Sequence, residues 1–149
     1  MNDIERLLAI EAIKQLKARY FRFMDTKDWS SLPTVFAPDA QMDMRGETGD
    51  DSGLITGGVN VAAFMRASIE HIVTVHHGHT PEIEILSATA ARGIWPMEDK
   101  LWKEAGSAST LPFKALHGYG HYHETYSKID GQWLIQTTKL TRLRVDFVQ

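Results

Sequence analysis

The sequence predicts an α+β fold in which helices pack on a curved, mostly antiparallel sheet. Two observations indicate this class. Through the first half of the chain, apolar side chains recur at steps of three and four, and from residue 76 onward the period changes to two. Helices followed by a meander of strands are typical of one α+β domain. The chain of 149 residues is long enough for one such domain, residues 1–149, and too short for two.

The first helix is predicted over residues 3–24. Its apolar face is marked by Ile13, Leu16, Tyr20, Phe23 and Met24. The basic side chains of Lys14, Lys17 and Arg22 are expected mostly on the opposite face, in solvent.

Two further helices are predicted before the strands begin. The first of them covers residues 29–36 and follows Asp28, a residue type that caps helix N-termini. The next is expected between residues 61 and 72, with Asn60 as its candidate cap. Both place apolar residues at helical spacing toward the core.

The rest of the chain alternates as strands do. Residues 41–44 predict a short strand, and residues 46–58 look like a loop. Asp130-Gly131 is a strong hairpin signal, while residues 98–114 remain ambiguous between strand and exposed loop. Four long strands are predicted over residues 76–86, 88–97, 117–128 and 133–145.

Composition excludes several classes of function. The chain has 16 Lys and Arg against 19 Asp and Glu, so its net charge is −3, and it has no basic block. Nucleic acid is therefore not an expected partner. The absence of cysteine excludes disulfides, thiolate nucleophiles and thiolate metal sites. With no apolar signal segment and no run of about 18 apolar residues, we expect a cytoplasmic protein without a membrane partner.

Asp25 and His76 are the candidate catalytic residues. Asp25 closes the first predicted helix, and His76 opens a strand-like run. An imidazole supported by a carboxylate transfers protons without a cofactor, provided that the pair is held in a dry environment. The alternatives are a solvent-exposed carboxylate at a helix end and a hydrogen-bonded strand histidine. Because neighbouring strand residues face opposite sides, His76 and His77 cannot both point inward.

A second histidine cluster raises the question of a metal. His121 and His123 share one strand face, which is a known ligand spacing. A third ligand is missing, because the adjacent Glu124 faces the other side. We therefore predict no metal site.

Aromatic and methionine side chains are numerous enough to line an apolar cavity. Their alternative role is ordinary core packing. The candidate substrate-binding residues are Tyr20, Met24, Met44, Phe64, Trp95 and Tyr122.

Several segments resemble one family over nearly the whole chain. The segments are Tyr20…Asp25-Thr-Lys-Asp-Trp29, Thr74-Val-His-His-Gly-His-Thr-Pro-Glu-Ile-Glu-Ile85 and Tyr126-Ser-Lys-Ile-Asp-Gly-Gln-Trp133. They look like SnoaL-like proteins of the nuclear transport factor 2-like superfamily, with the scytalone dehydratase-like branch as the nearest. This resemblance implies a cone-shaped α+β barrel, whose strongly curved mixed sheet encloses a deep pocket. It also implies a homo-oligomer, either a dimer or a trimer.

The resemblance places a catalytic Asp–His dyad on Asp25 and His76. The tyrosines that polarise the substrate carbonyl in scytalone dehydratase align with Met24 and Met44, so that exact activity is not expected. We expect instead a cofactor-independent lyase, of the dehydratase or dehydrohalogenase type, for a small and largely apolar cyclic or aromatic substrate. Tyr122 is the first candidate hydrogen-bond donor. The alternatives are a non-catalytic small-molecule binding protein and an isomerase of ring substrates.

Overall fold

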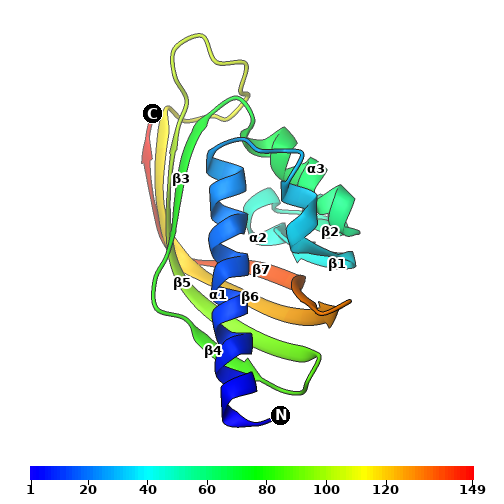
Figure 1. Ribbon diagram of the computed structural model, residues 1–149. Helices are drawn as coiled ribbons and strands as arrows, with labels where there is room; N and C mark the ends of the chain where they lie inside the picture. The colour runs from blue at the N-terminus through cyan, green and yellow to red at the C-terminus, as the bar shows by residue number, and fades with distance from the viewer.

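The computed structural model describes all 149 residues and has the predicted α+β architecture (Figure 1). The helices are α1 (Asp3–Asp25), α2 (Arg45–Thr48) and α3 (Gly58–Ile69), with the 3₁₀ turns η1 (Leu32–Val35) and η2 (Asp51–Gly53). The strands are β1 (Phe36–Asp43), β2 (Leu54–Thr56), β3 (Val73–Gly78), β4 (Glu82–Ile85), β5 (Ala90–Trp102), β6 (Ala115–Ile129) and β7 (Gln132–Val148).

All seven strands form one mixed sheet. Their order is β2-β1-β7-β6-β5-β3, and β4 also pairs with β5. Only β1 and β7 run parallel, while every other pair is antiparallel. The long strands bend around α1, and the helices lie on one side of the sheet (Figure 1). The sheet thus has an inner face that contacts the helices and an outer face without helices.

The first helix is fixed at its start by a capping box. The Glu5 backbone N–H donates to the Asn2 side chain at 2.9 Å, and the Asn2 backbone N–H donates to the Glu5 carboxylate at 2.7 Å. Its apolar stripe, which includes Ile13, Leu16 and Met24, is buried against the sheet. Lys17 lies on this buried side as well, so its predicted exposure is wrong. The helix ends at Asp25, beside β3.

The segment after α1 differs from the prediction. The helix expected over residues 29–36 is only the 3₁₀ turn η1, because Pro33 has no N–H to continue a helix. Asp28 still accepts a hydrogen bond from the Ser31 backbone N–H at 3.2 Å. The strand expected at residues 41–44 begins earlier, at Phe36, where its pairing with β7 starts.

Two other expectations also need correction. The predicted loop at residues 46–58 contains α2, η2 and β2. Asn60 does not cap α3: the cap is Gly57, and the Asn60 side-chain amide donates to the Thr56 carbonyl at 2.9 Å.

The later strands are close to the prediction. The run 76–86 is divided into β3 and β4 around Pro81, which has no N–H for strand pairing, and the ambiguous segment 98–114 is strand as far as Trp102. The β6–β7 hairpin turn is confirmed. Asp130 and Gly131 both have positive φ, 48° and 80°, as a tight two-residue hairpin requires.

Candidate active site

The last turn of α1 and the inner face of β3 bring Asp25 and His76 together. Asp25 Oδ1 lies 2.6 Å from His76 Nδ1, and the His76 backbone N–H donates to Asp25 Oδ2 at 2.8 Å. The Thr74 hydroxyl donates to Oδ1 at 2.9 Å, and it accepts a hydrogen bond from Lys27 Nζ at 3.0 Å. The carboxylate is therefore held by three donors from one strand.

This geometry determines what the imidazole can do. A carboxylate next to Nδ1 favours the tautomer with its proton on Nδ1, which leaves the lone pair on Nε2. His76 Nε2 has no hydrogen-bond partner in the protein. The ring stacks on Phe21, with 5.9 Å between centroids and 9° between planes, and the His76 side chain is only 6% exposed. His76 is therefore a candidate general base, with Nε2 free and the side chain almost fully shielded from water.

The neighbouring histidine faces the other way. The His77 side chain is 59% exposed, and its Nδ1 lies 3.4 Å from the Glu98 carboxylate on the outer face. Strand alternation therefore separates the two imidazoles, as the sequence required, with His76 on the inner face.

A second pair of charges lies beside the dyad on the inner face. Asp99 of β5 is the cross-strand partner of His76 and is buried. The Arg142 guanidinium forms a bidentate pair with it, with Nη1–Oδ1 2.7 Å and Nη2–Oδ2 3.0 Å. Arg142 also binds the Glu47 carboxylate of α2. Burial lowers the pKa of Arg142, but its hydrogen bonds with Asp99 and Glu47 outweigh burial and raise that pKa overall.

Asp99 and Arg142 are not among the residues predicted for the site. Gly118, the next residue across the sheet from Asp99, was the available signal. A side chain there would collide with Arg142 Nη1 and Asp99 Oδ1, so the glycine makes room for the ion pair. The signal was weak, because a register shift between Tyr119 and Gly120 changes which β7 residue reaches this place.

A buried ion pair occupies the interior deeper along α1. Lys17 Nζ lies 2.5 Å from Glu124 Oε1, and both side chains are almost fully buried. The Tyr126 hydroxyl donates to Glu124 Oε2 at 2.6 Å, and the Thr138 hydroxyl donates to Oε1 at 3.0 Å. Burial lowers the pKa of Lys17 against the opposing effect of Glu124. The ammonium also lies 3.6 Å from the Tyr122 ring centroid, a cation–π distance.

The predicted substrate-binding residues divide into two groups. Tyr20, Met24, Trp95 and Tyr122 are buried in the core. The Trp95 indole N–H is already engaged, because it donates to the Tyr126 hydroxyl at 2.8 Å. Met44 and Phe64 are half-buried at its edge.

The deep pocket implied by the resemblance is not open at the dyad. Five principal hollows are present, and none is lined by Asp25 or His76. The reason is packing: Phe21 contacts both the His76 ring and Tyr122, and Tyr122 in turn packs on Tyr20 and Lys17.

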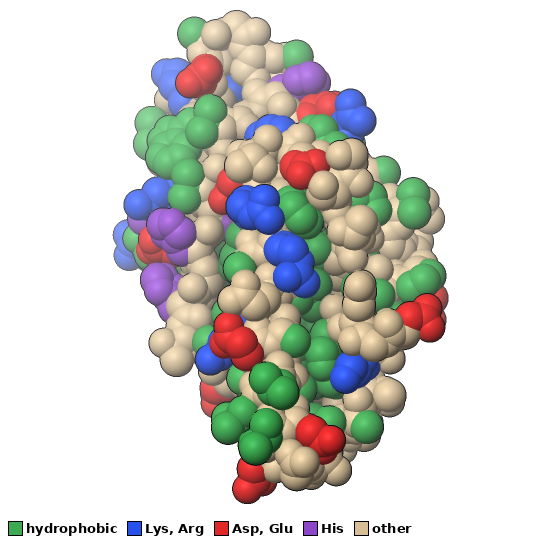
Figure 2. Space-filling model, in the orientation of Figure 1, with side chains coloured by type: hydrophobic (Ala, Val, Ile, Leu, Met, Phe, Trp, Pro, Cys, Tyr) green, Lys and Arg blue, Asp and Glu red, His purple; other side chains and the backbone are tan.

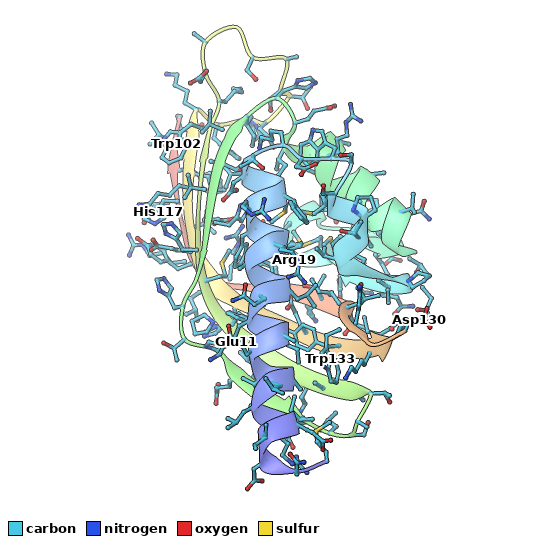
Figure 3. The ribbon with its side chains drawn as sticks, viewed as in Figure 1. Glu11, Arg19, Trp102, His117, Asp130 and Trp133 are labelled. Atoms are coloured by element: carbon cyan, nitrogen blue, oxygen red, sulfur yellow. The ribbon has the colours of Figure 1, made fainter.

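The remaining histidines lie mostly on the outer face. His117 points away from α1 (Figure 3), and histidine side chains reach the surface along the left edge in Figure 2. The His121 and His123 rings are 6.2 Å apart. The largest of the five principal hollows, about 860 Å³, lies on this face and includes His123. No three His, Asp or Glu side chains lie close enough together to form a metal site. No helix has the length and apolar character needed to cross a membrane.

Known proteins resemble this chain over most of its length. The profile of the SnoaL-like domain family matches residues 5–139. "Probable cyclase FGR4" of Gibberella zeae is 26% identical, and the match covers 91% of each chain. A crystal structure of a hexachlorocyclohexane dehydrochlorinase (LinA), type 2, has 18% identity and a TM-score of 0.81 over 99% of this chain and 94% of that one. The Kfla4162 protein of Kribbella flavida has 22% identity and a TM-score of 0.80 over 91% of each chain. The two structures show a shared fold.

Proposed function

The chain belongs to the SnoaL-like domain family, and on that premise we propose that it is a cofactor-independent enzyme that converts a small molecule by proton transfer. The single observation that carries the proposal is the contact between Asp25 and the His76 ring at 2.6 Å, with Nε2 left free. A relative named as a cyclase and a dehydrochlorinase of the same fold support small-molecule chemistry. The reaction we assign is a lyase reaction of the dehydratase or dehydrohalogenase type.

The dyad would act first as a base and then as an acid. His76 Nε2 takes a proton from a carbon next to the one that carries the leaving group. The electron pair of that C–H bond forms a C=C double bond, and the hydroxide or halide leaves with the electrons of its own bond. The imidazolium can return the proton to a departing hydroxide, which leaves as water. Asp25 stabilises the imidazolium that forms in between.

Two groups are candidates for stabilising the negative charge that develops. Asp99 is the cross-strand partner of His76, and its bidentate pair with Arg142 holds the guanidinium near the dyad. Tyr122 is buried, and burial raises the pKa of its phenol well above the usual value, so the hydroxyl stays protonated as a donor. Phe21 stacks on the His76 ring, and this apolar neighbour favours a cyclic, largely apolar substrate.

The outer face supports the expected homo-oligomer. It carries no helix, and Trp102, Leu143 and Val148 are exposed apolar side chains on its strands. Burying such a patch against a second copy would remove it from water. We propose a small molecule as substrate and a second copy of the chain as partner.

One observation favours the rival function, binding without chemistry: neither Asp25 nor His76 lines any of the five principal hollows. The test is a screen of cyclic β-hydroxy and β-halo compounds for elimination, followed by kinetics of variants. His76→Ala and Asp25→Asn should each lower kcat/KM by about 10²- to 10⁴-fold, the usual contribution of a general base. His77→Ala, one residue away, is the matched control and should leave the rate unchanged. Turnover that survives in His76→Ala rejects the mechanism.

A further inference from the structure

Helix α1 ends in a turn that usually contains a glycine. The Lys27 backbone N–H donates to the Met24 carbonyl at 3.2 Å, and the Asp28 N–H donates to the Phe23 carbonyl at 2.8 Å. These two hydrogen bonds form a Schellman motif, in which the left-handed residue is usually glycine. Here that residue is Lys27, with a φ of 59°. Because a side chain in this conformation costs stability, the lysine indicates a role for its ammonium group.

The Lys27 side chain reaches the dyad through one hydroxyl group. Its Nζ donates to the Thr74 hydroxyl at 3.0 Å, and Thr74 donates to Asp25 Oδ1 at 2.9 Å. The same carboxylate oxygen lies 2.6 Å from His76 Nδ1. A single oxygen atom therefore separates the ammonium from the carboxylate that supports His76.

The ammonium fixes the direction of the Thr74 hydroxyl. An ammonium group has donors and no acceptor, so Thr74 must accept from Lys27, and its own hydrogen is left for Asp25. Thr74 is 3% exposed and Lys27 is half-buried, which limits the competition from water. Asp25 thus receives a donor whose orientation is set by the protein.

The charge of Lys27 acts on the dyad because no other acidic side chain neutralises it. Burial lowers the pKa of Lys27, and the one charged group that opposes this effect is Asp25. The other charged groups on the inner face are already paired: Asp99 with Arg142, and Lys17 with Glu124. A cation at this distance disfavours a second positive charge on the His76 ring.

We propose that Lys27 is a positioning residue for the dyad: through Thr74 it holds the Asp25 carboxylate in place, and its charge makes the His76 imidazolium release its proton more readily. In the proposed elimination, His76 first takes a proton and then returns it. The cation makes the ring a weaker base in the first step and a stronger acid in the second. This role in catalysis rests on the proposed function, whereas the effect of Lys27 on His76 does not.

The experiment follows the His76 ring by NMR in ¹⁵N-labelled protein as the pH is varied. Lys27→Met removes the charge at nearly constant volume, and Lys27→Arg keeps the charge. Without the cation, both members of the dyad bind a proton more readily. The midpoint of His76 protonation should therefore rise by about 0.5 pH unit in Lys27→Met and stay near that of wild type in Lys27→Arg.

Arg22→Met is the matched control. Arg22 is an exposed cation in the same last turn of α1, and its guanidinium lies over the Phe23 ring, 4.8 Å from the centroid. Its removal should leave the His76 midpoint unchanged. A shift as large as that of Lys27→Met would show that any cation of this helix end has the same effect, and it would overturn the proposal.

Lys27→Gly separates the proposed role from a structural one. Glycine adopts the left-handed conformation freely, so the urea midpoint of unfolding should equal or exceed that of wild type. The His76 midpoint should nevertheless rise as it does in Lys27→Met. A marked loss of stability in Lys27→Gly, or a His76 midpoint that stays at the wild-type value, would contradict the inference.

Thr74→Val tests the hydroxyl. In this background the ammonium acts on the dyad only through space, so Lys27→Met should move the His76 midpoint clearly less than it does in wild type. Thr74→Ser keeps the hydroxyl and should preserve the full effect. An undiminished effect of Lys27→Met in Thr74→Val would overturn the route through Thr74. Because none of these measurements uses turnover, a failure here is distinct from a failure of the enzyme proposal.

Discussion

Two adjacent histidines of β3 have carboxylate neighbours and almost nothing else in common. His76 meets Asp25 at 2.6 Å on the inner face, where the same carboxylate also takes a backbone N–H and the Thr74 hydroxyl. His77 meets Glu98 at 3.4 Å on the outer face, and its side chain is mostly in water. Residue types alone do not make a proton-transfer pair. The pair must also be buried, and several donors must hold its carboxylate in place.

The same contrast extends to the ion pairs on the two sides of the structure. The side chains of the inner pairs Lys17–Glu124 and Asp99–Arg142 are buried or nearly so, and their N–O distances are short. In the outer pair Arg92–Glu84, both side chains are exposed. Buried pairs are costly to break and exposed pairs are not.

Breaking the deepest pair should have the largest effect on stability. Lys17→Ala leaves Glu124 buried without its counter-charge, so the free energy of unfolding should fall by about 3–5 kcal/mol. Arg92→Ala is the outer control and should cost at most about 1 kcal/mol. Urea denaturation measures both. Similar losses for the two variants would contradict the distinction between the two faces.

Alkaline pH should destabilise the protein through its inner tyrosines. Burial raises the phenol pKa values of Tyr20, Tyr122 and Tyr126 above 10, the unfolded value. Below pH 10 these groups are neutral in both states. Above it only the unfolded state loses the protons, so stability falls by about 1.4 kcal/mol per pH unit for each tyrosine.

The ionisation of Lys17 changes the free energy of unfolding with pH in the opposite direction. Burial lowers its folded pKa, so stability rises with pH until unfolded lysine has lost its proton, about one unit above pH 10.5. Burial also lowers the pKa of Lys27, which acts in the same direction. Above about pH 11.5 the change in unfolding free energy with pH therefore reports mainly the tyrosines. Absorbance at 295 nm should show that these three ionise only as the protein unfolds. Reversible ionisation of all four tyrosines near pH 10 in the folded protein would refute the prediction.

Adding one methyl group should destabilise the protein at a closely packed glycine and have little effect at a glycine in open space. Gly118→Ala places a carbon against Arg142 and Asp99 on the inner face, and overpacking of this kind costs about 1–3 kcal/mol. At Gly46 nothing lies within 4 Å, so Gly46→Ala should be neutral or slightly stabilising. Thermal unfolding of both variants measures the difference. An equal change in Tm for the two would show that position 118 is not packed as described.

The smallest effect is expected on the outer face. The hydrogen bond from His77 holds the pKa of the Glu98 carboxyl below its usual value. A lowered carboxyl pKa contributes stability above the unfolded pKa, and this contribution is lost as pH falls through the folded pKa. Because the pair is exposed, Glu98→Gln should leave the Tm within experimental error of wild type at pH 7 and at pH 4. A clear drop at pH 7 alone would assign a real stabilising role to this pair.

The sequence predicts those parts of the fold that depend on local patterns. The helical spacing of Ile13, Leu16 and Tyr20 predicted α1, and Asp130-Gly131 predicted the last hairpin. Local signals also misled, because Lys17 looked like a solvated residue until Glu124, more than a hundred positions away, supplied its partner.

Within the candidate site, the sequence predicted the dyad and missed the charges around it. Asp25 and His76 were chosen from residue type, alternation and resemblance, and the structure brings them into contact. The Asp99–Arg142–Glu47 chain depends on the register of three strands and on a bulge in β7. Contacts of that kind combine distant segments, so no local pattern contains them.

The nitrogen spectrum of His76 tests the central claim most directly. In ¹⁵N-labelled protein, at a pH where the ring is neutral, the account predicts a proton on Nδ1 and an unprotonated Nε2. This preference should weaken in Asp25→Asn, with exposed His77 as the internal reference. A His76 ring protonated on Nε2 instead, or with the same tautomer mixture as His77, would contradict it.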